Sequence, residues 1–118
     1  MTLKRIGAGK RMSDAVIHNG MVYLAGVVPE KTVGKGVKEQ TEDVLAQIDE
    51  VLAQAGSDKT LIVKANIWLS DIRTFAQMNE AWDAWVVAGQ TPARATVESK
   101  LAGVGIDVEI MVEAALKG

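Results

Sequence analysis

Cysteine is absent from the 118-residue chain, and histidine occurs only once, at position 18. The lack of cysteine excludes disulfides, thiolate zinc sites and cysteine nucleophiles, and it suits a reducing compartment. The lone His18 excludes a multi-histidine metal centre, and it is the only residue that a Ser-His-Asp triad would have for its base. His18 precedes an Asn-Gly pair, so we expect a solvent-facing turn histidine and not a catalytic one.

A surplus of positive charge is also missing. The chain has 13 Lys and Arg residues against 15 Asp and Glu residues, which gives a formal net charge of −2. This balance does not favour binding to nucleic acid or to an anionic membrane. No apolar run approaches the roughly 20 residues that span a bilayer, and the first ten residues lack the apolar segment of a signal peptide. We therefore expect a cytoplasmic protein with no membrane or nucleic-acid partner.

The length and a hydrophobic content of 48% predict a single domain over residues 1–118. A short strand is expected at 3–6, followed by a hairpin at 15–25, because Asn19-Gly20 is a strong two-residue turn signal. The nearly continuous apolar run at 61–69 predicts a buried central strand. Further strands are expected at 94–100 and 107–114, the last with strict alternation of apolar and polar residues.

Helical periodicity appears twice between these strands. One stripe over 37–55 predicts an amphipathic helix that ends at Gly56, and a second helix is expected over 75–86. Trp82 and Trp85 lie on one face of that helix without interleaved basic residues, so we interpret them as core or interface anchors and not as a base-stacking platform.

The element order predicts an α+β fold, a mixed β-sheet with two helices on one face. Two helices of this length cover only one side of such a sheet. The other side carries Tyr23, Val97 and Met111 and would remain wet in a monomer. Because apolar faces of that size are usually interfaces, we expect a homo-oligomer.

Arg94 is the first candidate for a functional residue. Pro92 fixes its own backbone and disfavours helix at Thr91, so Arg94 enters the following strand on a stiffened chain. A guanidinium held in this way suits bidentate capture of a carboxylate or phosphate. A surface arginine in an ion pair at a strand start is the alternative, and these residues alone leave it open.

Pro92-Ala93-Arg94 is followed fifteen residues later by a glutamate in Val108-Glu109-Ile110, which is a specific combination. Together with several other stretches it resembles the reactive-intermediate deaminase (Rid, YjgF) family from about residue 17 to residue 114. The resemblance implies a chorismate-mutase-like fold and a homotrimer in which the sheets form a central barrel with the helices outside. It also implies active sites in clefts between subunits. The other matching stretches are 22–26 (VYLAG), 40–56, 67–71 (IWLSD) and Met78-Asn79.

The resemblance further implies a deaminase that hydrolyses reactive enamine and imine intermediates to 2-keto acids and ammonia. Its substrates would be 2-iminopropanoate, the tautomer of 2-aminoacrylate, and 2-iminobutanoate. Arg94 is implied as the clamp for the substrate carboxylate, and Glu109 as the acid that positions water and moves protons. No metal or other cofactor is expected. The remaining implied substrate-binding positions are Met12, Ala25, Gly26, Asn79 and Thr96.

The chain departs from the family pattern at three of these positions. Met12 stands where a tyrosine is usual, Ala25 where a serine is frequent, and Thr96 where a cysteine is frequent. A non-catalytic or regulatory module that binds small carboxylates is therefore the alternative function. A ribonuclease or translation inhibitor gains little support, because the chain is acidic and has no basic stripe.

Overall fold

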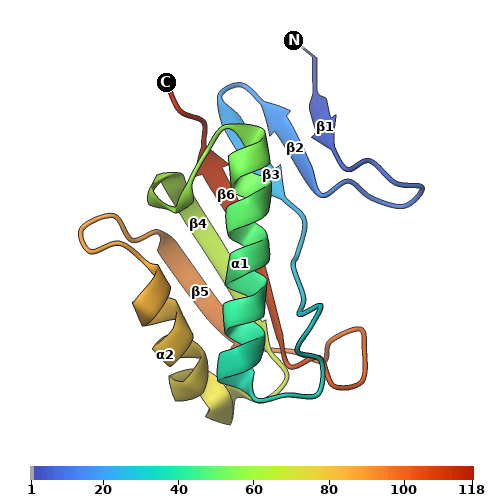
Figure 1. The fold of residues 1–118 in the computed structure, drawn as a ribbon, viewed down its shortest axis with the longest axis vertical. Coiled ribbons are helices and arrows are strands. Elements are labelled where there is room, and N and C mark those ends of the chain that lie inside the picture. The colour runs from blue at the N-terminus through green and yellow to red at the C-terminus, as the bar shows by residue number, and fades with distance from the viewer. Residues whose placement is uncertain (1) are drawn as a thin grey trace.

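The protein, described here by a computed structural model over residues 2–118, is a six-stranded mixed sheet with two helices on one face (Figure 1). The strand order is β1-β2-β3-β6-β4-β5, with β4 and β5 parallel and the other neighbouring pairs antiparallel. The predicted α+β class is confirmed. The elements are β1 (Lys4–Ile6), β2 (Ala15–His18), β3 (Met21–Leu24), α1 (Val37–Ala55), η1 (Lys59–Leu61), β4 (Ile62–Leu69), η2 (Ile72–Thr74), α2 (Phe75–Trp85), β5 (Ala93–Glu98) and β6 (Val108–Ala115).

The β2–β3 hairpin forms where Asn19-Gly20 predicted it. Both turn residues have positive φ, 52° for Asn19 and 75° for Gly20, which is the backbone that a two-residue primed turn requires. The prediction of a solvent-facing His18 is only partly right. The side chain is half-buried: Nε2 lies 3.1 Å from Nδ2 of the exposed Asn19, whereas Nδ1 is buried and has no hydrogen-bond partner among the residues described.

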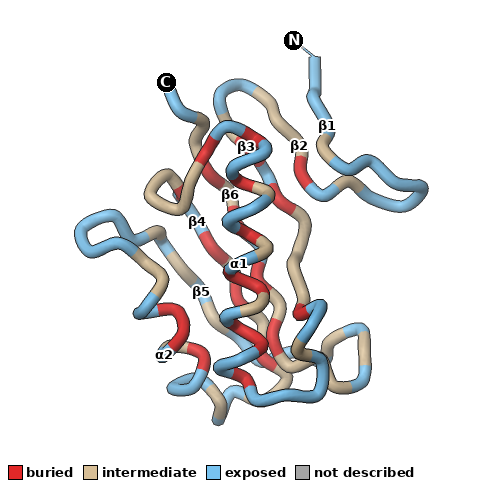
Figure 2. The backbone as a smooth tube through the Cα atoms, in the orientation of Figure 1, coloured by how far each residue is buried: buried red, intermediate tan, exposed pale blue. Residues whose placement is uncertain are grey.

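The core lies between α1 and the sheet, as the buried segments in Figure 2 show. Val44, Ile48 and Leu52 are fully buried, and burial of each such side chain stabilises the fold by about 1.5–3 kcal/mol. Gly56 ends α1 in the left-handed region at φ 83°. Among residues 2–118, neither helix combines the length and hydrophobicity that a membrane span requires.

Gln40 is a buried polar residue of α1 that sequence periodicity did not single out. Its Nε2 donates to the carbonyls of Lys35 and Gly105, both at 2.9 Å, and its Oε1 accepts from the backbone N–H of Asp107 at 2.8 Å. Because Asp107 immediately precedes β6, this side chain fixes the start of the strand that carries Glu109.

The second face of the sheet has no covering element within residues 2–118. Side chains of β6 alternate as predicted, with Val108, Ile110 and Val112 buried against the helices. On the opposite face, Tyr23 is 40% exposed and Met111 is 39% exposed.

The prediction for β4 is only partly right. The strand lies inside the sheet, between β6 and the edge strand β5. Val63 and Lys64 are nevertheless exposed, because no helix of residues 2–118 covers the second face and the register shifts between Ile62 and Lys64. Its apolar run therefore does not imply burial on two sides.

Candidate functional site

Arg94 lies on β5, at one edge of the sheet, and its side chain points to the face that the helices cover. The parallel register places it beside Ala65 of β4, which is fully buried under the helices. Its Nη1 donates to Oδ1 of Asn79 on α2 at 2.8 Å. The guanidinium carbon lies 5.2 Å from the ring centroid of Trp82 and 5.6 Å from that of Phe75. Two aromatic rings and one amide therefore hold the guanidinium.

The charge of Arg94 is not neutralised by a carboxylate. The ion pairs found in residues 2–118 involve other side chains, so the surface ion pair that the sequence left open does not form. Burial lowers the pKa of Arg94, and the nearby Asp83 opposes this effect. An arginine remains charged at neutral pH in spite of such a shift. One hydrogen bond to Asn79 leaves several N–H donors of Arg94 free for an anion.

Thr96 provides a second polar group next to Arg94. It lies two residues further along β5 and therefore projects to the same side of the sheet. Its Oγ1 is buried and has no hydrogen-bond partner among the residues described. Buried hydroxyls are rarely left without a partner, so this oxygen is available to a bound group. We call Phe75, Asn79, Trp82, Arg94 and Thr96 the Arg94 half-site.

Glu109 lies on the opposite face of the sheet. Its register partner on β4 is Trp68, between the buried residues Ile67 and Leu69, so Glu109 and Trp68 project to the uncovered face. Its carboxylate lies against the backbone of Gly26, where any β-carbon would collide with it. Glycine at position 26 thus permits the close approach of the backbone to this carboxylate.

Gly26 also lines a cleft of about 460 Å³, together with Ala25 and Met12. The cleft runs along the side of α1, and Met12 at its rim is 57% exposed. Glu109 is not among the residues that line the cleft. We call Met12, Ala25, Gly26 and Glu109 the Glu109 half-site.

The predicted site residues thus fall into two groups on one chain. Arg94, Asn79 and Thr96 form one group, and Glu109 with Gly26 forms the other. Arg94 is in register with Ala65 and Glu109 with Trp68, three positions further along β4. An odd separation places two side chains on opposite faces, so Glu109 does not pack against Arg94 within one chain.

Phe75 and Trp82 contact Arg94, but sequence reasoning interpreted Trp82 as a core or interface anchor and did not single out Phe75. A usable signal was present, because Phe75, Asn79 and Trp82 are spaced i, i+4 and i+7 and therefore share one face of α2. Two aromatic residues that flank an amide on one helical face suit the binding of a guanidinium.

Comparison with known proteins places the chain in a family. The family model described as Endoribonuclease L-PSP matches residues 2–116. The RutC family protein YoaB of Escherichia coli is 50% identical over 98% of this chain and 100% of its own length. A protein of Arabidopsis thaliana named Reactive Intermediate Deaminase A, chloroplastic, is 35% identical over 86% of this chain and 55% of its own length. A crystal structure from Neisseria meningitidis, described as a member of the YjgF protein family, superposes with a TM-score of 0.96 at 47% identity, over 100% of this chain and 98% of that one. The chain therefore belongs to the YjgF (Rid) family, the family of the endoribonuclease L-PSP model.

Proposed function

We propose that this protein is a deaminase that hydrolyses small 2-imino acids to 2-keto acids and ammonia. Its substrates are 2-iminopropanoate, the tautomer of 2-aminoacrylate, and 2-iminobutanoate. The observation that carries the proposal is the half-buried guanidinium of Arg94, which has no carboxylate partner among the residues described. The relative named Reactive Intermediate Deaminase A supports the reaction class.

Arg94 binds the substrate carboxylate in this proposal. Its free N–H groups form two charge-assisted hydrogen bonds, with the geometry that a planar carboxylate matches. Asn79 and the rings of Phe75 and Trp82 fix the plane of the guanidinium, which limits the rotamer entropy lost on binding. The unpaired hydroxyl of Thr96 supplies one further polar contact.

Glu109 positions the attacking water and transfers protons in this proposal. As the water oxygen bonds to the imine carbon, the carboxylate accepts one water proton, and the electron pair of the C=N bond moves to nitrogen. The imine nitrogen takes this proton from the glutamic acid, which gives a carbinolamine. The carboxylate then accepts the hydroxyl proton of the carbinolamine and passes it to the amine nitrogen, so the C–N bond breaks, the carbonyl forms and ammonia leaves. General acid–base catalysis of this kind contributes about 10²–10⁴-fold, and orientation of the water adds to it.

The two half-sites act together across a contact between two copies of the chain. Arg94 of one copy faces Glu109 of the next, because the sheet separates them within a single copy. Each copy then offers two different surfaces, and such a head-to-tail contact closes into a ring when the rotation between neighbouring copies is a whole fraction of a turn. We propose a homotrimer whose uncovered sheet faces meet at the centre, where Tyr23 and Met111 become buried.

Turnover is tested in a coupled reaction. A threonine or serine dehydratase generates the imine, and 2-keto-acid release is followed with and without the protein. We expect faster release with the wild type and none of this acceleration with Arg94→Ala. An acceleration that survives the Arg94 change contradicts the proposal, as does a wild type without effect.

A mixing experiment tests the shared site. Arg94→Ala and Glu109→Gln are each expected to be inactive. A site is intact, however, when it takes Arg94 from a Glu109→Gln copy and Glu109 from an Arg94→Ala copy. After the two variants are unfolded and refolded together in equal amounts, about a quarter of the sites are intact if the copies assemble at random. No recovered activity would show that both residues must come from the same chain.

A non-catalytic module that binds small carboxylates is the second candidate. It is favoured by Met12 and Ala25, which bring no side-chain hydroxyl to the cleft. Thermal stabilisation by 2-oxobutanoate or benzoate that depends on Arg94, combined with no turnover in the coupled reaction, would support this module over the deaminase.

A further inference from the structure

Asp43 of α1 binds the chain segment that leads away from Gly26. Its Oδ2 accepts hydrogen bonds from the backbone N–H groups of Glu30, Lys31 and Thr32 at 3.0, 2.8 and 3.0 Å. The same oxygen accepts from Oγ1 of Thr32 at 2.8 Å, and Oδ1 accepts from Nε2 of Gln47 at 2.9 Å. Both carboxylate oxygens of Asp43 therefore accept hydrogen bonds. Oδ2 accepts all four that come from residues 30–32, which lie more than ten residues away in the sequence.

The other end of this segment is attached to β6. Val27 and Ile110 exchange two backbone hydrogen bonds, at 2.8 and 3.0 Å. Between the two attachments, Nε2 of Gln47 donates to the carbonyl of Val28 at 2.9 Å. Residues 26–32 are thus held between β6 and α1, and Gly26 is at the end that touches the Glu109 carboxylate.

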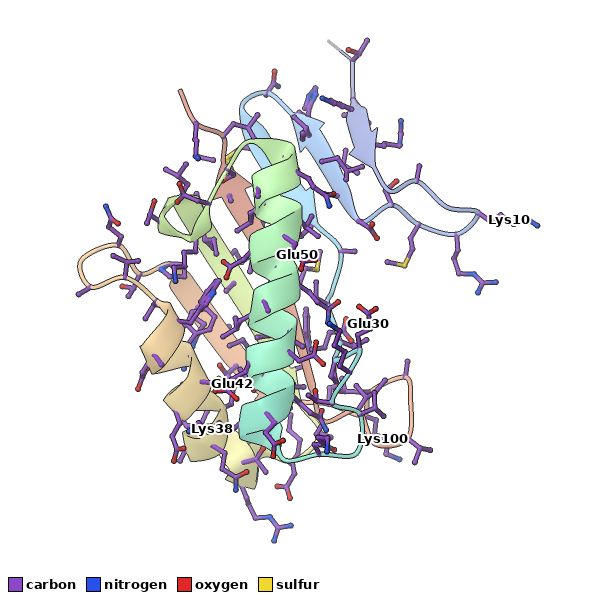
Figure 3. All side chains as sticks on the ribbon, viewed as in Figure 1. Lys10, Glu30, Lys38, Glu42, Glu50 and Lys100 are labelled. Atoms are coloured by element: carbon purple, nitrogen blue, oxygen red, sulfur yellow. The ribbon has the colours of Figure 1, made fainter. Side chains whose placement is uncertain are left out.

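Asp43 contributes more to the position of residues 26–32 than to the packing of α1 on the sheet. Asp43 is only half-buried, whereas Val44, Leu45 and Ile48 fix the helix to the sheet. Glu42 is its exposed neighbour, and Figure 3 shows Glu42 and Glu30 on different sides of α1.

We propose that Asp43 is a positioning residue for the Glu109 half-site, an inference that rests on the proposed deaminase function. Asp43 does not touch substrate. It holds residues 26–32 so that the backbone of Gly26 confines the Glu109 carboxylate. Without the charge on Asp43, residues 26–32 are held less firmly and the Glu109 carboxylate becomes more mobile, so kcat falls. KM stays nearly constant, because Arg94 is held by α2 and β5.

The test compares Asp43→Asn with Glu42→Gln, which removes the same charge one residue away. The first measurement is NMR of the Gly26 amide and the Glu109 carboxyl carbon, together with hydrogen exchange of the amides of residues 30–32. In Asp43→Asn we expect shifted signals and exchange that is roughly tenfold faster. In Glu42→Gln we expect both to match the wild type.

The second measurement is turnover in the coupled reaction. We expect Asp43→Asn to lower kcat roughly tenfold with KM unchanged, and Glu42→Gln to change neither. If Asp43→Asn does not fold, Thr32→Val removes only the hydroxyl donor to Asp43 and gives a smaller change in the same direction.

Gly26 and Glu109 signals that are equal in the two variants overturn the proposal, as does a loosened segment with unchanged kcat. A wild type without turnover refutes the deaminase function separately. The NMR comparison then still decides whether Asp43 positions Gly26 and Glu109.

Discussion

Arg94 offers the sharpest test, because the proposed function predicts that its loss affects ligand binding and stability by very different amounts. A hydrogen bond to a charged group contributes about 1.5–3 kcal/mol. Arg94→Lys keeps the charge but loses the planar fork and one of the two bonds. Binding of 2-oxobutanoate should therefore weaken by about ten- to a hundredfold. Arg94→Ala loses both bonds and the charge, so binding should become undetectable.

The effect of Arg94→Ala on stability is expected to be small. The contacts with Trp82 and Phe75, at 5.2 and 5.6 Å, each contribute about 0.5–1 kcal/mol. The hydrogen bond from Arg94 to Asn79 also favours the folded state. These contacts are opposed by the partial loss of hydration of the half-buried guanidinium, which also lowers the pKa of Arg94. The two effects oppose each other, so the free energy of unfolding should change by no more than about 1–2 kcal/mol.

Calorimetric titration with 2-oxobutanoate and urea unfolding measure the two quantities on the same samples. Arg73→Lys is the matched control, since Arg73 is exposed and already paired with Asp71 at 2.9 Å. Equal affinity in Arg94→Lys and wild type would refute the bidentate clamp. An Arg94→Ala protein that unfolds would show instead that the guanidinium is structural.

Four further predictions concern other parts of the proposed mechanism. Glu109→Gln should retain 2-oxobutanoate binding and lower kcat in the coupled reaction by about 10²–10⁴-fold; unchanged kcat would remove Glu109 from the chemistry. Gly26→Ala should displace the Glu109 carboxylate and lower kcat while the melting temperature changes little, because the colliding atoms belong to a flexible side-chain end. Met111→Glu should yield monomers in light scattering and abolish turnover; an active monomer would contradict the shared site. Burial raises the pKa of Asp43, but hydrogen bonds from Thr32, Gln47 and the backbone lower it overall below 3.8. The stabilisation by Asp43 should therefore be present above that pH and be lost as the pH falls through the folded pKa, with faster amide exchange at residues 30–32.

The elements of the fold were predictable from the sequence because their signals are local. Asn19-Gly20 specifies a turn by its backbone preference, and Gly56 ends α1 for the same reason. Alternation along β6 separates Val108 from Glu109 without knowledge of any other strand. The uncovered face followed from the number of helices available, and the exposure of Met111 agrees with it.

Contacts between segments far apart in the sequence were not predictable in this way. Gln40 and Asp43 have ordinary polar positions on a helix, and nothing local indicates that they bind residues 30–36 and 105–107. The same holds for Arg94, whose place under α2 depends on the register of β5 against β4. Resemblance to the family identified the candidate site residues. Only the register of β5 and β6 against β4 shows that Arg94 and Glu109 lie on opposite faces of the sheet.

The uncovered face and the divided site have one common cause. Both helices lie on one side of the sheet, so Glu109 and Met111 share the open side while Arg94 lies under α2. No change of side-chain rotamer brings Arg94 and Glu109 together through a hydrogen-bonded sheet. A second copy that covers the open face would bury Met111 and deliver an arginine in the same step. Assembly and catalysis should therefore be lost together, and a variant that separates them would contradict this account.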